Sequence, residues 1–176
     1  IFSLPDDIEY EDENNPSNYL NAKFAFLWDK EYLYFVIEVV DDKVVSREKA
    51  NEVHKGDCVE LFLSPKSNTL VWGDKRNLQI GFASDSIEKR PIGYAYFQGA
   101  EPAQDIEISA SRTSNGYKIV SKIRWSFIGM SPKKGAYLGM SVAVHDIDEV
   151  GSSGKKINWS FKTTSAGIKL GKLVLK

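Results

Sequence analysis

Residues 22–40 read AKFAFLWDKEYLYFVIEVV, a sequence with the two-residue period of extended strands. In the first part of this stretch Phe24, Phe26 and Trp28 fall on one face, because successive side chains of a strand point to opposite sides. Asp29 and Lys30 then form a tight turn into a second run that is rich in Tyr, Phe, Val and Ile, which favour strands. The stretch therefore predicts two consecutive strands that bury an aromatic face.

The same alternation continues along the chain. In residues 57–64, Glu60 points away from the face that Val59 and Leu61 share. Turn residues separate the strands, and Asn-Gly at 115–116 is a strong hairpin signal. These features predict an all-β fold, a single antiparallel β-sandwich of jelly-roll type with about nine or more strands. The strand-like segments are 22–28, 31–40, 57–64, 78–84, 106–112, 117–125, 138–144, 157–161 and 170–175.

Three segments depart from the alternation. Residues 125–129 (Trp125 to Gly129) fit one short helical turn, which the glycine ends. Residues 6–18 are acidic and rich in Asn and Pro, and we expect them to be extended over the surface. Residues 151–156 have the composition of a polar loop between strands.

The length of 176 residues is sufficient for one hydrophobic core, and we expect a single domain over residues 1–176. Because the chain begins at Ile1, without Met or the layout of a signal peptide, we expect that it is excised from a larger protein. No apolar run approaches the length of a membrane span, and the lone Cys58 excludes an intramolecular disulfide.

The charges almost balance, with 23 Lys and Arg against 24 Asp and Glu. This balance argues against nucleic acids and anionic membranes as partners, since both attract a basic surplus. Aromatic residues make up 12% of the chain, whereas His contributes only 2 residues and Cys 1, which is a poor supply for acid–base or nucleophilic catalysis. The composition predicts a domain that is not an enzyme and that uses aromatic rings for packing and stacking.

Two polar side chains lie on outward faces of predicted strands. Glu60 opposes Val59 and Leu61, and Gln79 opposes its apolar neighbours Leu78 and Ile80. A sugar hydroxyl donates and accepts hydrogen bonds at once, and a carboxylate with an amide can satisfy both roles. The pair therefore suits recognition of a polyhydroxylated ligand, although the same positions also suit ordinary solvated residues of a sheet.

Three aromatic residues fall where the strand pattern does not bury them. Trp72 lies between two turn-rich stretches, and Tyr94 and Tyr96 lie in a segment with Gly and Pro. Rings of this kind can stack on the C–H face of a sugar, or they can fold back on the sandwich.

Carboxylates gather at two predicted strand ends. Asp41 and Asp42 end one strand, and Asp146 and Asp148 begin a loop after another. Calcium prefers such oxygen ligands, and the spacing does not match an EF-hand. We therefore expect that a structural calcium ion can bind at these positions and that no cofactor is required.

Several motifs, taken in order, resemble the family 9 carbohydrate-binding modules, and the likeness covers most of the chain from Ala22 onward. They are AKFAFLWD at 22–29, YLY at 32–34, VVDD at 39–42, GDCVELFL at 56–63, Gln79, NGY at 115–117, IRW at 123–125, residues 138–146 and GKLVL at 171–175.

The resemblance implies a non-catalytic β-sandwich that binds oligosaccharide or polysaccharide, with calcium in some members. It also implies attachment to a polysaccharide-degrading catalytic domain, such as a glycoside hydrolase, and an extracellular, cell-surface or periplasmic location. The best-known members of the family clamp a sugar at a chain end between two Trp side chains. Here the first clamp position is His54 and the second, within residues 163–169, has no aromatic residue.

Glu60 and Gln79 match the pattern of the family, so the resemblance assigns them as hydrogen-bond anchors. His54, Trp72, Tyr94 and Tyr96 are then the candidate walls of the site. Two alternatives remain open at this point. One is a β-sandwich interaction or structural domain that has lost sugar binding. The other is a haem-binding relative, with ligands drawn from Met130, Met140, His54, His145 and Lys residues.

Overall fold

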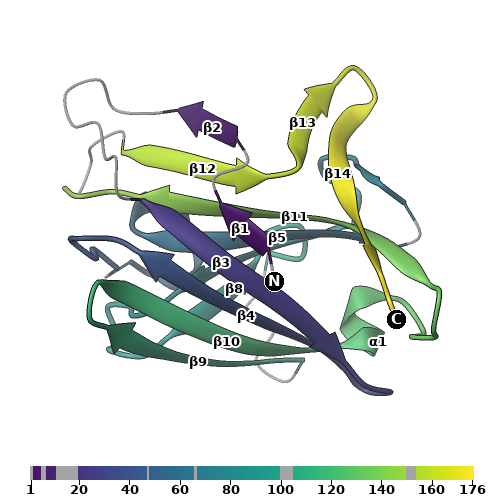
Figure 1. The fold of residues 1–176 in the computed structure, drawn as a ribbon, viewed down its shortest axis with the longest axis horizontal. Coiled ribbons are helices and arrows are strands. Elements are labelled where there is room, and N and C mark those ends of the chain that lie inside the picture. The colour runs from purple at the N-terminus through teal and green to yellow at the C-terminus, as the bar shows by residue number, and fades with distance from the viewer. Residues whose placement is uncertain are drawn as a thin grey trace.

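Two antiparallel sheets pack face to face (Figure 1). The computed structural model describes residues 2–4, 7–10, 20–46, 48–65, 67–99, 105–149 and 154–176. The elements are β1 (Phe2–Leu4), β2 (Asp7–Tyr10), β3 (Asn21–Trp28), β4 (Tyr32–Val40), the 3₁₀-helix η1 (Ala50–Lys55), β5 (Cys58–Pro65), β6 (Thr69–Leu70), β7 (Leu78–Ala83), β8 (Ile92–Ala95), β9 (Ile106–Thr113), β10 (Gly116–Arg124), α1 (Trp125–Ile128), β11 (Tyr137–Asp146), β12 (Lys155–Trp159), β13 (Phe161–Thr164) and β14 (Gly167–Val174).

The smaller sheet has the strand order β1-β3-β4-β10-β9. The larger sheet has the order β13-β14-β11-β5-β7-β8, with β12 joining β11 to β2 and with β6 beside β14. All the strand pairs are antiparallel. The predicted β-sandwich is therefore confirmed.

The main core lies between the two sheets and is rich in aromatic rings, as the alternation predicts. Phe24 and Phe35 enter it from the smaller sheet, and Phe82 enters from the larger one. The ring centroids of Phe35 and Phe82 are 6.1 Å apart, and those of Phe24 and Trp159 are 5.9 Å apart. Such contacts between rings add to the free energy gained from apolar burial.

The predicted helical turn and hairpin are both present. The helix α1 ends at Gly129, whose φ of 76° is the left-handed conformation that favours glycine. The hairpin of β9 and β10 turns just before Gly116, where a Cβ would collide with the carbonyl oxygen of Val39. Both glycines therefore occupy positions that other residues fill only with strain.

Of the two expectations about irregular segments, the one for residues 6–18 is tested only at β2 and the one for residues 151–156 needs revision. The stretch 6–18 contains β2, which pairs with β12, while residues 11–19 lie outside the described part of the chain. The predicted polar loop at 151–156 is wrong at its end, because Lys155 and Lys156 begin β12 and are buried. Pairing of β12 with strands on both sides outweighs the low strand preference of lysine. Within the described residues, neither helix approaches the length or apolar character needed to cross a bilayer.

Candidate functional site

The strand β5 lies in the middle of the larger sheet, between β11 and β7. Its residues Val59, Leu61 and Leu63 enter the main core. Glu60 and Phe62 therefore point to the opposite face of the sheet, which we call the outer face. The sequence-based prediction that Glu60 and Gln79 share this face agrees with the register, in which Gln79 pairs with Phe62.

Four side chains meet on the outer face and form what we call the polar centre: Glu60, Gln79, His145 and Lys156. Gln79 donates from Nε2 to Oε1 of Glu60 at 2.8 Å. His145 donates from Nε2 to Oε2 of Glu60 at 2.8 Å, and Nζ of Lys156 lies 3.6 Å from the same oxygen. The carboxylate thus joins side chains from β7, β11 and β12, which are neighbours across the sheet.

The Glu60 carboxylate is inaccessible although it points away from the main core. The residue is only 3% exposed. Burial alone would raise the pKa of Glu60, but the contacts with His145, Lys156 and Gln79 outweigh burial and lower the pKa to about 2. The carboxylate is therefore ionised at neutral pH, and it holds the three partner side chains in fixed positions.

Two tyrosines and a histidine, which we call the tyrosine wall, border the polar centre. The rings of Tyr94 and Tyr96 have centroids 5.3 Å apart, and the Tyr96 hydroxyl lies 3.4 Å from Nδ1 of His54. The Tyr96 phenol extends over Gly81, which pairs with Glu60 in the register. Burial, then the nearby Cys58 and Glu60, raises the pKa of Tyr96, so its hydroxyl remains a neutral donor.

Two small apolar clusters cover the outer face on either side of the polar centre. One lies under η1 and contains Val53, Cys58, Ala83 and Ile92, with Tyr96 packed against it. The other contains residues of β5, β6, β11 and β14, with Phe97 and Phe161 packed against it: Phe62, Leu70, Ala143, Ile168 and Leu170. The polar centre therefore lies between two apolar clusters, and water is excluded from both clusters.

Trp72 lies beside the second cluster rather than in the tyrosine wall. Its indole ring makes edge-to-face contacts with Phe97, at a centroid distance of 5.6 Å, and with Phe62, at 6.4 Å. The side chain is 55% exposed. The six predicted ligand-binding residues therefore form three groups: Glu60 with Gln79, His54 with the two tyrosines, and Trp72 by itself.

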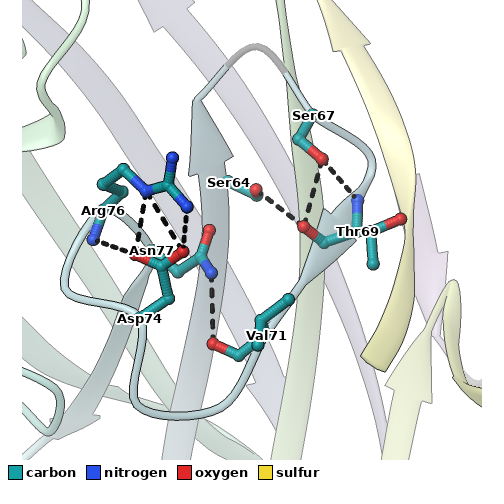
Figure 2. Close-up of polar contacts among 7 residues, drawn as sticks. All are labelled: Ser64, Ser67, Thr69, Val71, Asp74, Arg76 and Asn77. Atoms are coloured by element: carbon teal, nitrogen blue, oxygen red, sulfur yellow. Dashed lines mark hydrogen bonds and ion pairs between the residues drawn. The ribbon is translucent and has the colours of Figure 1, made fainter. Parts of the chain in front are cut away.

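The segment from β5 through β6 to β7 carries Trp72, and its own polar contacts hold it in place (Figure 2). Before β6, the hydroxyls of Ser64 and Ser67 both donate to the carbonyl of Thr69, at 3.0 Å and 3.1 Å. The backbone N–H of Thr69 donates in return to the Ser67 hydroxyl at 3.0 Å. These bonds define the course of the chain as it enters β6.

After β6, the turn around Trp72 is closed by Asn77 and Asp74. The Asn77 amide donates from Nδ2 to the carbonyl of Val71 at 3.2 Å, and Figure 2 shows this bond across the turn. The Asp74 carboxylate accepts from the backbone N–H of Arg76 at 3.0 Å and from its guanidinium. Trp72 is therefore carried by an ordered turn.

Several residues of this region were not predicted from the sequence. Lys156 falls in a loop predicted from the sequence, and nothing in the sequence indicates that His145 contacts Glu60. Phe161 on β13 packs against Phe62 at 5.0 Å and has Nζ of Lys156 5.4 Å from its ring centroid. Asn158, next to Lys156 on the outer side of β12, has a buried Oδ1 with no hydrogen-bond partner within the described part of the chain. The strand predicted at 157–161 begins one residue too late to include Lys156, and the contacts of His145 and Phe161 depend on pairing between strands far apart in the chain.

The predicted carboxylate cluster also forms, with a changed membership. Asp41, Asp57 and Asp146 each place an oxygen within 4.8 Å of those of the other two. Asp42 is exposed and Asp148 is partly exposed, and neither belongs to this group. Asp57 was missed because the sequence places it at the start of a strand, 16 residues after Asp41.

Asp57 connects two loops at this cluster. Its Oδ1 accepts from the backbone N–H of Ile147 at 2.6 Å, and its Oδ2 accepts from the backbone N–H of Val45. Burial, then the adjacent carboxylate of Asp41, raises the pKa of Asp57 well above its usual range. Burial likewise raises the pKa of Asp41. Packing several carboxylates together without a cation is therefore unfavourable.

Two observations fit a cation at this cluster. Within the described residues, Oδ2 of Asp41 and the hydroxyl of Tyr117 are buried and have no hydrogen-bond partner. Carboxylate oxygens are the ligands that calcium prefers, and a buried oxygen without a donor is open to coordination. The residues present are therefore of the chemical kind that a calcium ion prefers as ligands.

The candidate haem ligands do not form one site. Met130 and Met140 are part of the main core between the sheets. His145 binds Glu60 on the outer face, and His54 contacts Tyr96. These positions give no support to the haem-binding alternative.

Together, the two sheets form a β-sandwich that carries a buried polar network on one outer face. The model of the family described as "Carbohydrate family 9 binding domain-like" matches residues 3–176. The chain belongs to this family, and its class is therefore that of the non-catalytic carbohydrate-binding modules. The family resemblance found in the sequence is thereby confirmed.

Individual relatives agree with this assignment. An endo-1,4-β-xylanase A of Thermotoga maritima is 28% identical over 149 residues, which are 82% of this chain and 13% of that protein. A family 9 carbohydrate-binding module of Caldicellulosiruptor kristjanssonii was solved with cellotriose and with glucose. The cellotriose complex has a TM-score of 0.72 and 20% identity, over 98% of this chain and 80% of that one. The glucose complex has a TM-score of 0.69 and 21% identity, over 91% of this chain and 78% of that one. This chain thus spans only a small part of the xylanase, and the solved structures share its fold.

Proposed function

We propose that this domain binds carbohydrate at the polar centre and the tyrosine wall, and that it directs a larger polysaccharide-processing protein to glycan. The observation that carries the proposal is the buried, ionised Glu60 with its partners from three strands on the outer face. Such a network is preorganised, so a ligand does not have to order these side chains as it binds.

The residues of the polar centre have different proposed roles. Both oxygens of Glu60 already accept hydrogen bonds, so Glu60 acts mainly by positioning Gln79 and Lys156. Gln79 uses Nε2 toward Glu60, which leaves its carbonyl oxygen as an acceptor for a sugar hydroxyl. The half-buried rings of Tyr94 and Tyr96 supply an apolar surface and hydroxyl groups beside it.

The relatives suggest the ligand class and the context. Solved family 9 modules bind glucose and cellotriose, and a similar chain segment occurs in an endo-1,4-β-xylanase. We extend this ligand class and this context to the domain. We propose that its ligands are built from gluco- or xylo-configured pyranoses. We further propose an attached glycoside hydrolase, and a location outside the cell, on its surface or in the periplasm, where polymeric substrates are found.

We also propose that Asp41, Asp57 and Asp146 hold a structural calcium ion. The cation would neutralise the buried carboxylates and would support the two loops that Asp57 joins. The unpartnered oxygen of Asp41 supports this assignment.

Calorimetric titration with the glucose and xylose series, from monosaccharide to trisaccharide, tests the proposed sugar binding. We expect binding by the wild type and at least a tenfold loss of affinity in Gln79→Ala, because a hydrogen-bonding group of the site is removed. Glu38→Gln is the control, since Glu38 is exposed on the other sheet. Absence of heat at millimolar sugar would favour the alternative of an interaction domain without sugar binding. Unchanged affinity in Gln79→Ala would remove the polar centre from the proposal.

A further inference from the structure

Trp72 is the tryptophan with the most exposed side chain in the described part of the chain. It is 55% exposed, whereas Trp125 is 3% exposed and Trp28 and Trp159 are partly buried against the main core. The neighbouring Val71 is 47% exposed. Apolar surface that stays exposed gains no free energy from burial on folding, so the exposed parts of these two side chains are available for contact with a ligand.

The indole ring rests on an aromatic base. Phe97 and Phe62 contact it edge to face, with interplanar angles of 88° and 87°. Phe62 is in turn supported by Phe161 at 5.0 Å. The base fixes one side of the indole, and the exposed remainder is available to a ligand.

The turn that carries Trp72 is held at both of its ends. The backbone N–H of Asp74 donates to the carbonyl of Val71 at 3.2 Å, and that of Asn77 donates to Asp74 at 2.9 Å. The Asn77 side chain adds its bond to Val71, and Arg76 adds an ion pair to Asp74 at 2.5 Å (Figure 2). A ring held in this way loses little conformational entropy when a ligand stacks on it.

The register shows where Trp72 and its aromatic base lie relative to the polar centre. Trp72 contacts Phe62, Phe62 pairs directly with Gln79, and Gln79 binds Glu60. Tyr96 lies at the other side of Gln79, next to Gly81 and η1. Trp72 therefore lies on the Phe62 side of the polar centre, which is the side away from His54.

We propose that Trp72 forms a second subsite, which stacks on the next pyranose ring of a chain whose first ring is bound at the polar centre. This inference rests on the proposed sugar binding and names the ligand more closely. The ligand is an oligosaccharide of flat pyranose rings with equatorial linkages, because such rings present a continuous C–H face to an aromatic surface. The domain then binds chains in preference to single sugars.

The test compares affinities for a monosaccharide and a trisaccharide in three variants. Glucose and cellotriose form one series, and xylose and xylotriose form the other. We expect Trp72→Ala to weaken trisaccharide binding about three- to tenfold and to change monosaccharide binding less than twofold. Trp72→Phe keeps most of the trisaccharide affinity. Leu27→Ala is the control, because Leu27 is 73% exposed and lies on the other sheet.

Each other outcome contradicts a definite part of the inference. If Trp72→Ala remains folded by its thermal transition and binds the trisaccharide like the wild type, Trp72 is not a subsite. If mono- and trisaccharide affinities fall equally, Trp72 belongs to a single site with the polar centre, and no second subsite exists. If the wild type binds no sugar in either series, the proposed function fails first and the subsite with it.

Discussion

The phenol of Tyr96 occupies the space that a side chain at position 81 would need. A Cβ at Gly81 would lie 2.9 Å from the Tyr96 hydroxyl oxygen, 3.0 Å from Cε2 of the same ring and 2.6 Å from a methyl group of Val53. Glycine at 81 and tyrosine at 96 therefore depend on each other, and together they bring the tyrosine wall next to Glu60.

This contact predicts the effect of the smallest substitution. Gly81→Ala should destabilise the protein by about 1–3 kcal/mol, the usual cost of overpacking, and should displace Tyr96. Gly93→Ala on β8 is the matched control, because a Cβ there would meet the Phe82 ring at 3.5 Å, an ordinary contact. Denaturant unfolding of both variants measures the difference. Equal stability of the two variants would show that Tyr96 does not depend on the absence of a side chain at 81.

The ionised Glu60 predicts a dependence of stability on pH. The pKa of Glu60 is about 2 in the folded protein, compared with 4.5 for an unperturbed glutamate, so folding favours the ionised carboxylate. The stabilisation, about 3 kcal/mol for a shift of this size, is present above pH 4.5 and is lost as the pH falls toward 2. The wild type should therefore have a larger free energy of unfolding than Glu60→Gln. The difference between the two proteins should be smaller at pH 3 than at pH 6. A difference that stays constant between these pH values would contradict the assigned ionisation.

The carboxylate cluster predicts a response to calcium. Added Ca²⁺ should raise the melting temperature of the wild type relative to a chelator, since a ligand that binds only the folded state stabilises it. Asp41→Asn and Asp57→Asn should lose this response, because each removes a charged ligand. Asp42→Asn should keep it, since Asp42 is exposed and outside the cluster. The same shift in all three variants would place the ion elsewhere.

Trp72 should dominate the quenchable part of the tryptophan fluorescence, because of the 4 tryptophans it is the one with a highly exposed side chain. Acrylamide should quench the wild type more strongly than Trp72→Phe. If Trp72 stacks on sugar, a saturating trisaccharide should protect the wild type from quenching, while a monosaccharide protects it less. Trp28→Phe, which removes a partly buried ring, is the control and should leave the quenchable fraction nearly unchanged.

Strand periodicity and local turn signals were sufficient to predict the sandwich, the buried aromatic rings and the orientation of Glu60 and Gln79. The remaining parts of the site depend on contacts between residues far apart in the chain. Glu60 and His145 are 85 residues apart, and only pairing of β5 with β11 brings them together. The clamp position within residues 163–169 lacks an aromatic ring, but β13 places Phe161 beside Phe62 from just outside that window. Neither contact has a local sequence signal.

The strand β5 and the residue before it combine three tasks within six positions: Asp57 at the carboxylate cluster, Glu60 at the polar centre and Phe62 under Trp72. Inserting or deleting one residue between 57 and 62 would turn the following side chains to the opposite face. A change of two residues would restore the face but would alter the spacing among Asp57, Glu60 and Phe62 by one pleat repeat. This segment should therefore tolerate no change in length, because the spacing of its residues fixes the carboxylate cluster, the polar centre and the base of Trp72 relative to one another.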